Sequence, residues 1–478
     1  MEKIASLAVT HLRTALLAGE LSAAALIDNV LARVAAAGDD GVWIARIPEA
    51  HVRARAAALD EQAARDRGMP ARLPLFGIPF AVKDNIDVAG MPTTAGCPDF
   101  AYTPGESAPA VARLVAAGAV LVGKTNLDQF ATGLVGTRSP YGIARNPFDA
   151  RYIPGGSSSG SAVAVSSGIV SFALGTDTAG SGRVPAAFNN IVGLKPTRGR
   201  ISMRGVVPAC RSLDCVSVFA LTVEDAAEVL AVCGAYDAQD PFARSAPAAL
   251  PPIARPFRFA VPRSADLEFF GDAGAAGIFA RAVDALQALG GRCVNTDIAP
   301  FRQAAELLYS GPWVAERLAA IEDLFRSAPQ SLLPVTREII AGGAKYGAAD
   351  LFKAIYRLAE LKRATEPLWR EVDVLVLPTA PTIYRIAEVE EDPIGLNSRL
   401  GIYTNFVNLL DLAAIAVPAG FRDDGLPLGV SFIAPAFSDA ALCTLARTFT
   451  AGLDLPLGAG GRRDRGAQAF QSGRGMAR

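Results

Sequence analysis

The sequence is poor in the residues that most often supply catalytic bases, metal ligands or cross-links. Its 478 residues include 2 histidines and 6 cysteines. The cysteines lack the paired spacing of a zinc site and are too sparse for a disulfide scaffold, so we expect reduced thiols in a cytoplasmic protein. His11 and His51 stand in ordinary helical sequence without a glycine-rich setting. A serine enzyme that uses histidine as its base is therefore poorly supported.

An excess of charge of one sign and long apolar runs are also lacking. The chain has 46 Lys and Arg against 47 Asp and Glu, a formal net charge of -1. This balance gives no basic footprint for nucleic acid or an anionic membrane. Every apolar stretch is interrupted well before the roughly 20 residues that a membrane-spanning helix needs, and the N-terminus lacks a secretory signal pattern. We expect a small-molecule substrate, with no nucleic-acid partner, no membrane partner, no metal and no cofactor.

Apolar periodicity predicts an α/β fold. The segment 75–88 is apolar and β-rich, the segment 119–126 reads as a short parallel strand, and helical patterns alternate with both. Sheet signatures return at 372–381 and 412–421. Strands late in the chain can complete a sheet that begins early, so we expect one interwoven domain over 1–457. That domain should hold a large mixed β-sheet with helices on both faces.

Local signals mark several helices. Ser22 is a predicted N-cap, and Thr222 with Asp225 has the spacing of a capping box. The segment 301–365 reads as mostly helical. The residues from 458 to 478 are rich in Gly, Arg and Gln with little periodicity, which predicts a frayed tail.

The most unusual part of the sequence is the segment 155–181, which has a glycine-serine loop at each end and an Ala/Val-rich stretch between them. A phosphate-binding loop would need GxxxxGK, and no lysine follows in register. A flexible linker would not enclose a regular apolar segment. Small residues let successive backbone N–H groups form an anion-binding nest. A nucleophile loop with its own oxyanion hole therefore remains as the third interpretation.

Lys83 is the candidate base, because it lies in an apolar strand where burial would favour the neutral amine. The alternative is a structural role in which Lys83 forms an ion pair with Asp84 or Asp87. Spacing alone leaves both interpretations open.

Four motifs in order, GIPFAVKDNIDV, GKTNLDQFATG, GGSSSGSAVAVSSG and GTDTAGSGRVPAAF, closely resemble those of the amidase signature family. The resemblance implies the amidase signature fold and makes Lys83 the base. Ser157, after a cis peptide, is the proton relay, and Ser181 is the nucleophile. It also implies an oxyanion hole made by the backbone N–H groups of Thr178, Ala179, Gly180 and Ser181.

The residues around the nucleophile have implied supporting roles. Asp177 and Arg183 flank Ser181 in sequence, and we interpret them as a structural pair that shapes its loop. Ser158 and Ser159 are expected to form hydrogen bonds in the loop and at the start of the following helix.

Further segments, including ATGLVGTRSPYG (131–142) and LLYSGPWVAER (307–317), resemble the allophanate hydrolase branch of that family. Allophanate is urea-1-carboxylate, whose carboxylate needs a cation and a hydroxyl. The resemblance gives substrate binding to Tyr309, Arg317 and Gly133. Tyr309 and Arg317 lie two helical turns apart and are expected to share a face. It also implies a homodimer, with a larger nitrogen-catabolic assembly as an option, and a further C-terminal domain in full-length relatives.

Other functions stay open at this point. The chain could act on another small carboxylated amide, or it could be an amidotransferase subunit of the A type. It could also be a catalytically silent amidase-like scaffold, although a scaffold would have no need for Lys83, Ser157 and Ser181 together. Urea breakdown and s-triazine breakdown are both candidate pathways.

Overall fold

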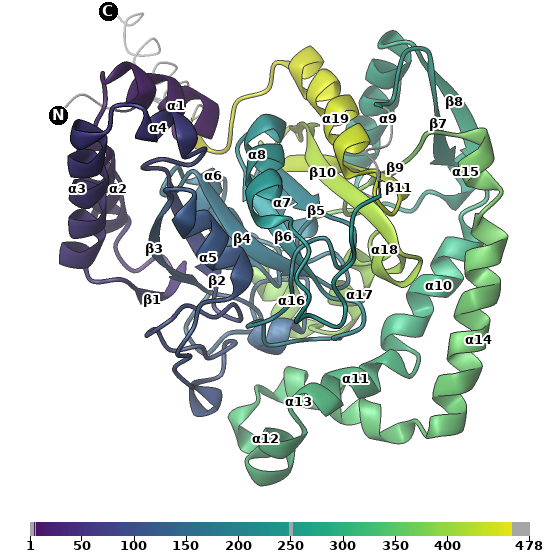
Figure 1. Cartoon of the computed structure of the whole chain (residues 1–478). Coiled ribbons are helices and arrows are strands. Elements are labelled where there is room, and N and C mark those ends of the chain that lie inside the picture. Colours follow the sequence, from purple (N-terminus) through teal and green to yellow (C-terminus); the bar gives the residue numbers. More distant parts are fainter. Residues whose placement is uncertain (1–3, 5, 248–251, 461–478) are drawn as a thin grey trace, which may run out of the picture.

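One twisted mixed sheet runs through the molecule (Figure 1). The computed structural model describes residue 4 and the segments 6–247 and 252–460, so residues 461–478 of the expected tail lie outside the described residues. Within the described part the sheet has 11 strands in the order β1-β3-β2-β4-β6-β5-β10-β11-β9-β7-β8. The strands are Trp43–Arg46, Pro79–Lys83, Val120–Thr125, Phe172–Asp177, Val192–Lys195, Cys215–Ala220, Phe257–Pro262, Gly291–Thr296, Val374–Pro378, Leu412–Phe421 and Pro427–Pro435, numbered β1 to β11.

The sheet contains two parallel groups of strands joined by antiparallel pairs. β2 runs parallel to β3 and β4, and β7 runs parallel to β8 and β9. The other neighbours are antiparallel, including β5 with β10, so a late strand does complete the early part of the sheet. Every residue of β2, β3, β4 and β6 is buried. Strands buried at both alternating positions need cover on both faces, and the predicted mixed sheet flanked by helices is confirmed.

Nineteen α-helices surround this sheet within the described residues. None of them combines the length and apolarity needed to cross a bilayer. They are, as α1 to α19, Val9–Ala18, Ala23–Ala37, Glu49–Arg65, Met69–Arg72, Pro109–Ala116, Ser159–Ser166, Val184–Phe188, Val223–Cys233, Ala273–Ala288, Ala299–Tyr309, Trp313–Ala320, Glu322–Ser327, Pro334–Ala341, Ala348–Thr365, Leu368–Glu371, Ile386–Glu391, Gly395–Leu400, Phe406–Leu409 and Asp439–Leu453.

The two predicted helix starts differ in how they are capped. The Ser22 side chain accepts from the Ala25 N–H at the start of α2, as expected. At α8 the Thr222 hydroxyl accepts from the Asp225 N–H, which is half of a capping box. The Asp225 carboxylate instead accepts from the N–H groups of Val9 and Thr10. It therefore caps the first turn of α1, because unpaired N–H groups at a helix start attract an anion.

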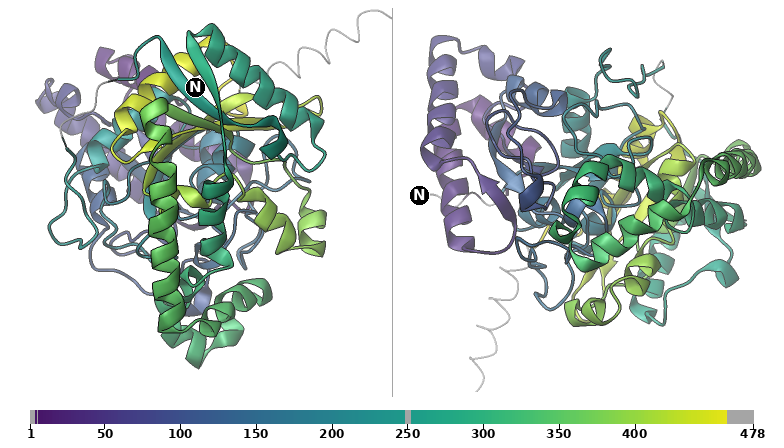
Figure 2. Two further views of the ribbon diagram at one scale, coloured as in Figure 1. Left: turned by 90° about the vertical axis from the view of Figure 1, so that its right-hand side faces the viewer. Right: turned by 90° about the horizontal axis from the view of Figure 1, so that it is seen from below.

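The segment 301–365 holds α11 to α14 and most of α10. In both views of Figure 2 the long green helix α14 lies on the side of the molecule away from the purple helices α2 and α3. The helical conformation is interrupted between α10 and α11, at Ser310, Gly311 and Pro312. Proline has no N–H to continue the ladder of α10. Tyr309 and Arg317 consequently lie on two helices, whereas the sequence analysis expected one face of a single helical segment.

Candidate active site

Lys83 is the last residue of β2 and is fully buried. Its Nζ donates to Ser157 Oγ and to Thr176 Oγ1, both at 2.7 Å. Burial lowers the pKa of Lys83 to about 7, although the carboxylates of Asp128, Asp214 and Asp177 oppose part of that shift. A lysine with such a pKa is neutral in about half of the molecules near pH 7 and can accept a proton.

The acidic neighbours of Lys83 in sequence have other partners. Asp84 forms a fully buried ion pair with Lys124, with 3.2 Å between Nζ and Oδ1. Asp87 accepts hydrogen bonds from the Thr93 and Tyr102 hydroxyls. The structural alternative, in which Lys83 is held by Asp84 or Asp87, is therefore wrong. Because Asp84 and Asp87 are held by these partners, the Lys83 amine donates to hydroxyl groups instead.

Ser157 lies two residues before the start of α6, and the Gly156–Ser157 peptide bond is cis, as the family resemblance implied. The next serine, Ser158, occupies the N-cap position of α6, but its hydroxyl donates to the Thr176 carbonyl rather than capping the helix. The Ser159 hydroxyl donates to Asn126 O at 3.5 Å. Both serines thus fasten α6 to adjacent strands and loops beside Ser157.

Ser181 lies in the loop between β4 and α7 and is 3% exposed. Its hydroxyl donates to the Gly133 carbonyl at 3.4 Å. A Cβ at Gly133 would approach Asp128 Oδ2 to 2.6 Å, so a side chain at this position would require a shift. β2 and β4 are parallel neighbours, and their carboxyl ends meet at one edge of the sheet. This places the Lys83 and Ser181 segments together.

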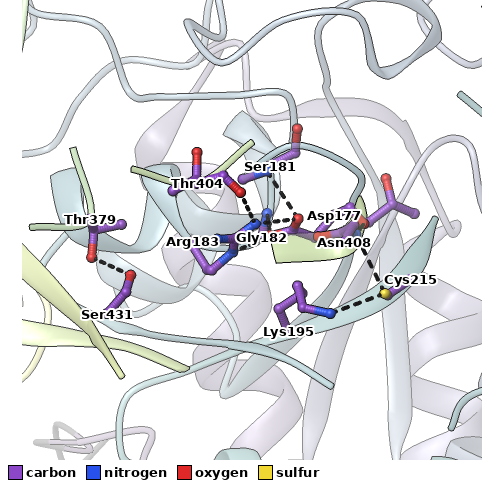
Figure 3. Close-up of polar contacts among 12 residues, drawn as sticks. Asp177, Ser181, Gly182, Arg183, Lys195, Cys215, Thr379, Thr404, Asn408 and Ser431 are labelled. Atoms are coloured by element: carbon purple, nitrogen blue, oxygen red, sulfur yellow. Dashed lines mark hydrogen bonds and ion pairs between the residues drawn. The ribbon is translucent and has the colours of Figure 1, made fainter. Parts of the chain in front are cut away.

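Asp177 and Arg183 form the frame of the nucleophile loop, and Figure 3 shows their contact. Arg183 donates from Nε and Nη2 to the two carboxylate oxygens, both at 2.9 Å. The same carboxylate accepts from the Gly180 and Gly182 N–H groups at 3.0 Å each. Burial pushes the pKa of Asp177 up, but Arg183 and these donors leave it below its usual value. The expected structural pair is thus a bidentate ion pair in the core.

This frame distinguishes among the four backbone N–H groups expected to form an oxyanion hole. The Gly180 N–H is directed at Asp177. Its φ of 133° lies where L-residues rarely occur, and a Cβ would meet Thr404 Oγ1 at 2.4 Å. The side chain of Thr178 donates to Asp214, and burial raises the pKa of that carboxyl to about 6. The N–H groups of Thr178, Ala179 and Ser181 are therefore the better candidates for binding an oxyanion.

Arg317 on α11 is 2% exposed, and the helix break does not separate it from Tyr309. Its Nη2 donates to Tyr309 Oη at 3.0 Å, and its guanidinium carbon lies 5.0 Å from the centre of the Tyr309 ring. Its Nη1 donates to Thr132 Oγ1 at 3.1 Å and to Ala131 O at 3.3 Å. In the part of the chain that the structure describes, its hydrogen bonds reach no carboxylate, and its Nε has no partner. An unpaired buried guanidinium is costly and suits an anionic ligand.

One short segment links these groups. Arg317 contacts residues 131 and 132, and Ser181 contacts residue 133. The predicted residues Tyr309, Arg317, Gly133 and Ser181 therefore lie around the same stretch of chain. His11 and His51 are exposed on α1 and α3.

Sequence reasoning missed three side chains that belong to this region: Thr132, Thr176 and Asp214. Thr176 directly precedes Asp177 in the nucleophile motif, so its nearness to Lys83 had a local signal. Thr132 lies in the motif at 131–142, directly before Gly133, but no local pattern showed the partner of Thr132 or of Asp214: 185 residues separate Thr132 from Arg317, and 36 separate Thr178 from Asp214.

Comparison with known proteins gives one matching family and several relatives. The sequence profile described as Amidase matches residues 25–443. The chain is 45% identical over 434 residues to urea amidolyase of Saccharomyces cerevisiae, which covers 89% of this chain and 23% of that protein. It is 37% identical over 475 residues to the A-type subunit of glutamyl-tRNA(Gln) amidotransferase from Chloroflexus aggregans, covering 92% of this chain and 95% of that protein.

A solved structure of allophanate hydrolase from Kluyveromyces lactis is also similar. It is 45% identical, with a TM-score of 0.84, and the match covers 90% of this chain and 70% of that one. The chain thus spans less than a quarter of the urea amidolyase sequence that it matches.

Proposed function

Because the chain belongs to the amidase family, we propose that it is an amidohydrolase that releases ammonia from the terminal amide of allophanate. The urea amidolyase relative is much longer than this chain, and the match covers 23% of it. The proposal assigns roles to the groups around Ser181, and the contacts of each group support its role.

The proton route begins at Lys83. In its neutral form the Lys83 amine accepts the Ser157 proton while it donates to Thr176, using the two 2.7 Å contacts. Ser157 then takes the proton of Ser181. For this step the Ser181 hydroxyl turns from the Gly133 carbonyl, where its 3.4 Å hydrogen bond is weak, toward Ser157. Activation of a serine by an adjacent base makes it a nucleophile at neutral pH.

The oxyanion then forms at the loop 178–181. We assign its stabilisation to the N–H groups of Thr178, Ala179 and Ser181. The fourth expected donor, Gly180, holds the Asp177 carboxylate, and so it shapes the loop. Removal of one oxyanion donor costs about 3 to 4 kcal/mol in well-studied hydrolases.

Arg317 and Tyr309 are proposed to bind the substrate carboxylate. A guanidinium offers two parallel N–H donors to a carboxylate, and the Tyr309 hydroxyl adds a third donor. Gly133 connects this pair to Ser181: it follows Thr132, which Arg317 contacts, and its carbonyl accepts from Ser181, while a side chain at Gly133 would meet Asp128. A carboxylate would also satisfy the buried charge of Arg317.

The reaction is an acyl transfer. Ser181 Oγ adds to the terminal carbonyl carbon, and its proton passes through Ser157 to Lys83. Return of that proton to the amide nitrogen lets ammonia leave as the C–N bond breaks. Water, activated by the same groups, then hydrolyses the acyl-enzyme and restores Ser181. The product is N-carboxycarbamate.

The observation that carries the substrate assignment is Arg317, a buried guanidinium whose hydrogen bonds, among the described residues, reach two hydroxyls and a carbonyl. The test is ammonia release from allophanate by the wild type and by Ser181→Ala, together with labelling by a fluorophosphonate. We expect the variant to lose both. Ammonia release at the wild-type rate from Ser181→Ala would refute the assignment of the nucleophile.

Amidotransferase activity is the second candidate, supported by the identity to the glutamyl-tRNA(Gln) amidotransferase chain over nearly the whole length of both proteins. Its assay is ammonia release from glutamine. Glutamine carries an ammonium group beside its carboxylate, and among the described residues the hydrogen bonds of Arg317 reach no carboxylate that could receive this group. We therefore expect allophanate to be preferred.

The setting of the enzyme is inferred from the family and from its cysteines. All six cysteines are unpaired thiols, which fits a reducing cytoplasm. We infer a homodimer from the family resemblance, with light scattering of the purified chain as the check. Urea breakdown and s-triazine breakdown remain the candidate pathways.

A further inference from the structure

Residues 209–214 lie between the oxyanion-hole loop and the helix that carries Arg317. They directly precede β6, which pairs antiparallel with β4, with Cys215 opposite Asp177. Next to this pair, the Thr178 hydroxyl donates to the Asp214 carboxylate. The two loops therefore leave the sheet side by side, and the proposed mechanism gives no role to the segment 209–214.

Asp214 joins this segment to the oxyanion-hole loop. It is 5% exposed and accepts from the Thr178 hydroxyl and from the N–H groups of Ala209, at 2.8 Å, and Cys210, at 3.1 Å. A second connection comes from Asn408, whose Nδ2 donates to Asp177 O at 2.8 Å and to Leu213 O at 2.9 Å.

Ser212 joins the segment to α11. Its N–H and its hydroxyl both donate to the Glu316 carboxylate at 2.7 Å. Cys210 Sγ also approaches the carbonyl of Trp313, the first residue of α11, at 3.6 Å. Glu316 directly precedes Arg317, so the carboxylate that holds Ser212 is adjacent in sequence to the proposed substrate-binding arginine.

We propose that residues 209–214 are a positioning link that fixes the oxyanion-hole loop relative to Arg317, with Asp214 acting through Thr178 and Ser212 acting through Glu316. This inference rests on the proposed function. The link keeps a fixed distance between Arg317, which binds the carboxylate, and the oxyanion-hole loop, which binds the amide carbonyl. It thereby favours short amides whose carboxylate lies one or two bonds beyond the amide carbon, as in allophanate, over longer ones.

The first test breaks the Asp214 end. Thr178→Val keeps the shape of the side chain and removes the hydroxyl donor. Thr197→Val is the control for loss of a buried hydrogen bond to a carboxylate: the Thr197 hydroxyl donates to Asp439, at the start of α19, at 2.7 Å and also accepts from the Phe437 N–H, so this loss is at least as severe. Both variants lose a hydrogen bond to a carboxylate, so both should melt earlier. We expect Thr178→Val to lower kcat for allophanate about tenfold to 100-fold with KM nearly unchanged, and Thr197→Val to match the wild type.

Fluorophosphonate labelling of Ser181 separates this inference from the proposed function, because the reagent needs the oxyanion hole and no substrate carboxylate. Thr178→Val should label more slowly than Thr197→Val even if allophanate proves to be the wrong substrate. Asp214→Asn, whose amide would face the N–H groups of Ala209 and Cys210, is the second variant should Thr178→Val fail to fold. Labelling of both variants at the rate of Thr197→Val would overturn the inference.

The second test breaks the Glu316 end. Ser212→Ala removes one of the two hydrogen bonds to Glu316. We expect it to lower kcat/KM for allophanate about threefold to tenfold, and to lower fluorophosphonate labelling by less, since the reagent does not engage Arg317. An equal effect on allophanate and on the reagent, or no effect on allophanate, would show that the segment does not connect the two ends.

Discussion

Arg183 and Arg317 are both buried beside the nucleophile segment, and they differ in what balances their charge. Arg183 donates two hydrogen bonds to the Asp177 carboxylate. Arg317 donates to hydroxyl and carbonyl groups. A buried cation that is paired with a carboxylate is already neutralised and has a structural role. A buried cation without such a partner can still bind an anionic ligand. The contrast distinguishes the frame of the site from its recognition element.

The largest expected effect is a loss of stability when Arg183, the arginine that is paired with a carboxylate, is replaced. Arg183→Met leaves the Asp177 carboxylate buried without its cation, and loss of one partner of a buried pair typically costs about 3 to 5 kcal/mol of stability. Arg317→Met is the matched control, because it leaves no carboxylate partner unpaired. Urea denaturation should give the larger loss for Arg183→Met, and equal losses would contradict the comparison.

The next effect concerns recognition. Arg317→Met should lower kcat/KM for allophanate roughly tenfold to 100-fold, a loss of about 1.5 to 3 kcal/mol of transition-state stabilisation, because it removes charged donors to the substrate carboxylate. A steady-state ammonia assay measures this loss, and fluorophosphonate labelling of Ser181 reports whether the nucleophile is still active. A comparable loss of labelling would mean that Arg317 acts on the chemistry and not on recognition.

A third buried basic residue, Lys83, differs from both arginines because its charge should change near neutral pH, and the rate should change with it. Burial lowers its pKa to about 7, and only the neutral amine can act as base. Below pH 7 the rate should fall about tenfold per pH unit as Lys83 is protonated, and above pH 7 it should level off. A kcat/KM profile from pH 5 to pH 9 measures this. A rate that is flat across pH 7 would exclude Lys83 as the base.

The smallest expected effect is that of Tyr309→Phe. It removes one neutral hydroxyl donor from the carboxylate site and keeps the ring that faces Arg317. We expect a loss of about 1 kcal/mol, or several-fold, in kcat/KM for allophanate. If the loss exceeded that of Arg317→Met, the hydroxyl and not the guanidinium would be the main recognition group.

The sequence allowed prediction of those features that have a local signal. Lys83 in its apolar strand, the glycine-serine loops around Ser157 and Ser181, and the Ser22 cap could all be seen in short segments. The mixed sheet followed from the alternation of apolar patterns. The site roles came from the ordered family motifs, since spacing alone permitted more than one interpretation of Lys83.

Features made by distant segments could not be predicted in the same way. The Asp225 carboxylate caps α1 from 216 residues away instead of closing its own capping box. Arg317 reaches Thr132 across 185 residues. The break at Gly311 and Pro312 did have a local signal, and the helical spacing of Tyr309 and Arg317 was given more weight than that signal.

The most direct test of the role of Arg317 is ammonia release by the wild-type protein from allophanate, biuret, malonamate, acetamide and glutamine at equal concentrations. If Arg317 receives a substrate carboxylate, allophanate should be fastest, malonamate should react more readily than neutral acetamide or biuret, and glutamine should react slowly. Turnover of acetamide or biuret as fast as that of allophanate would contradict the role of Arg317, and preference for glutamine would contradict the proposed function.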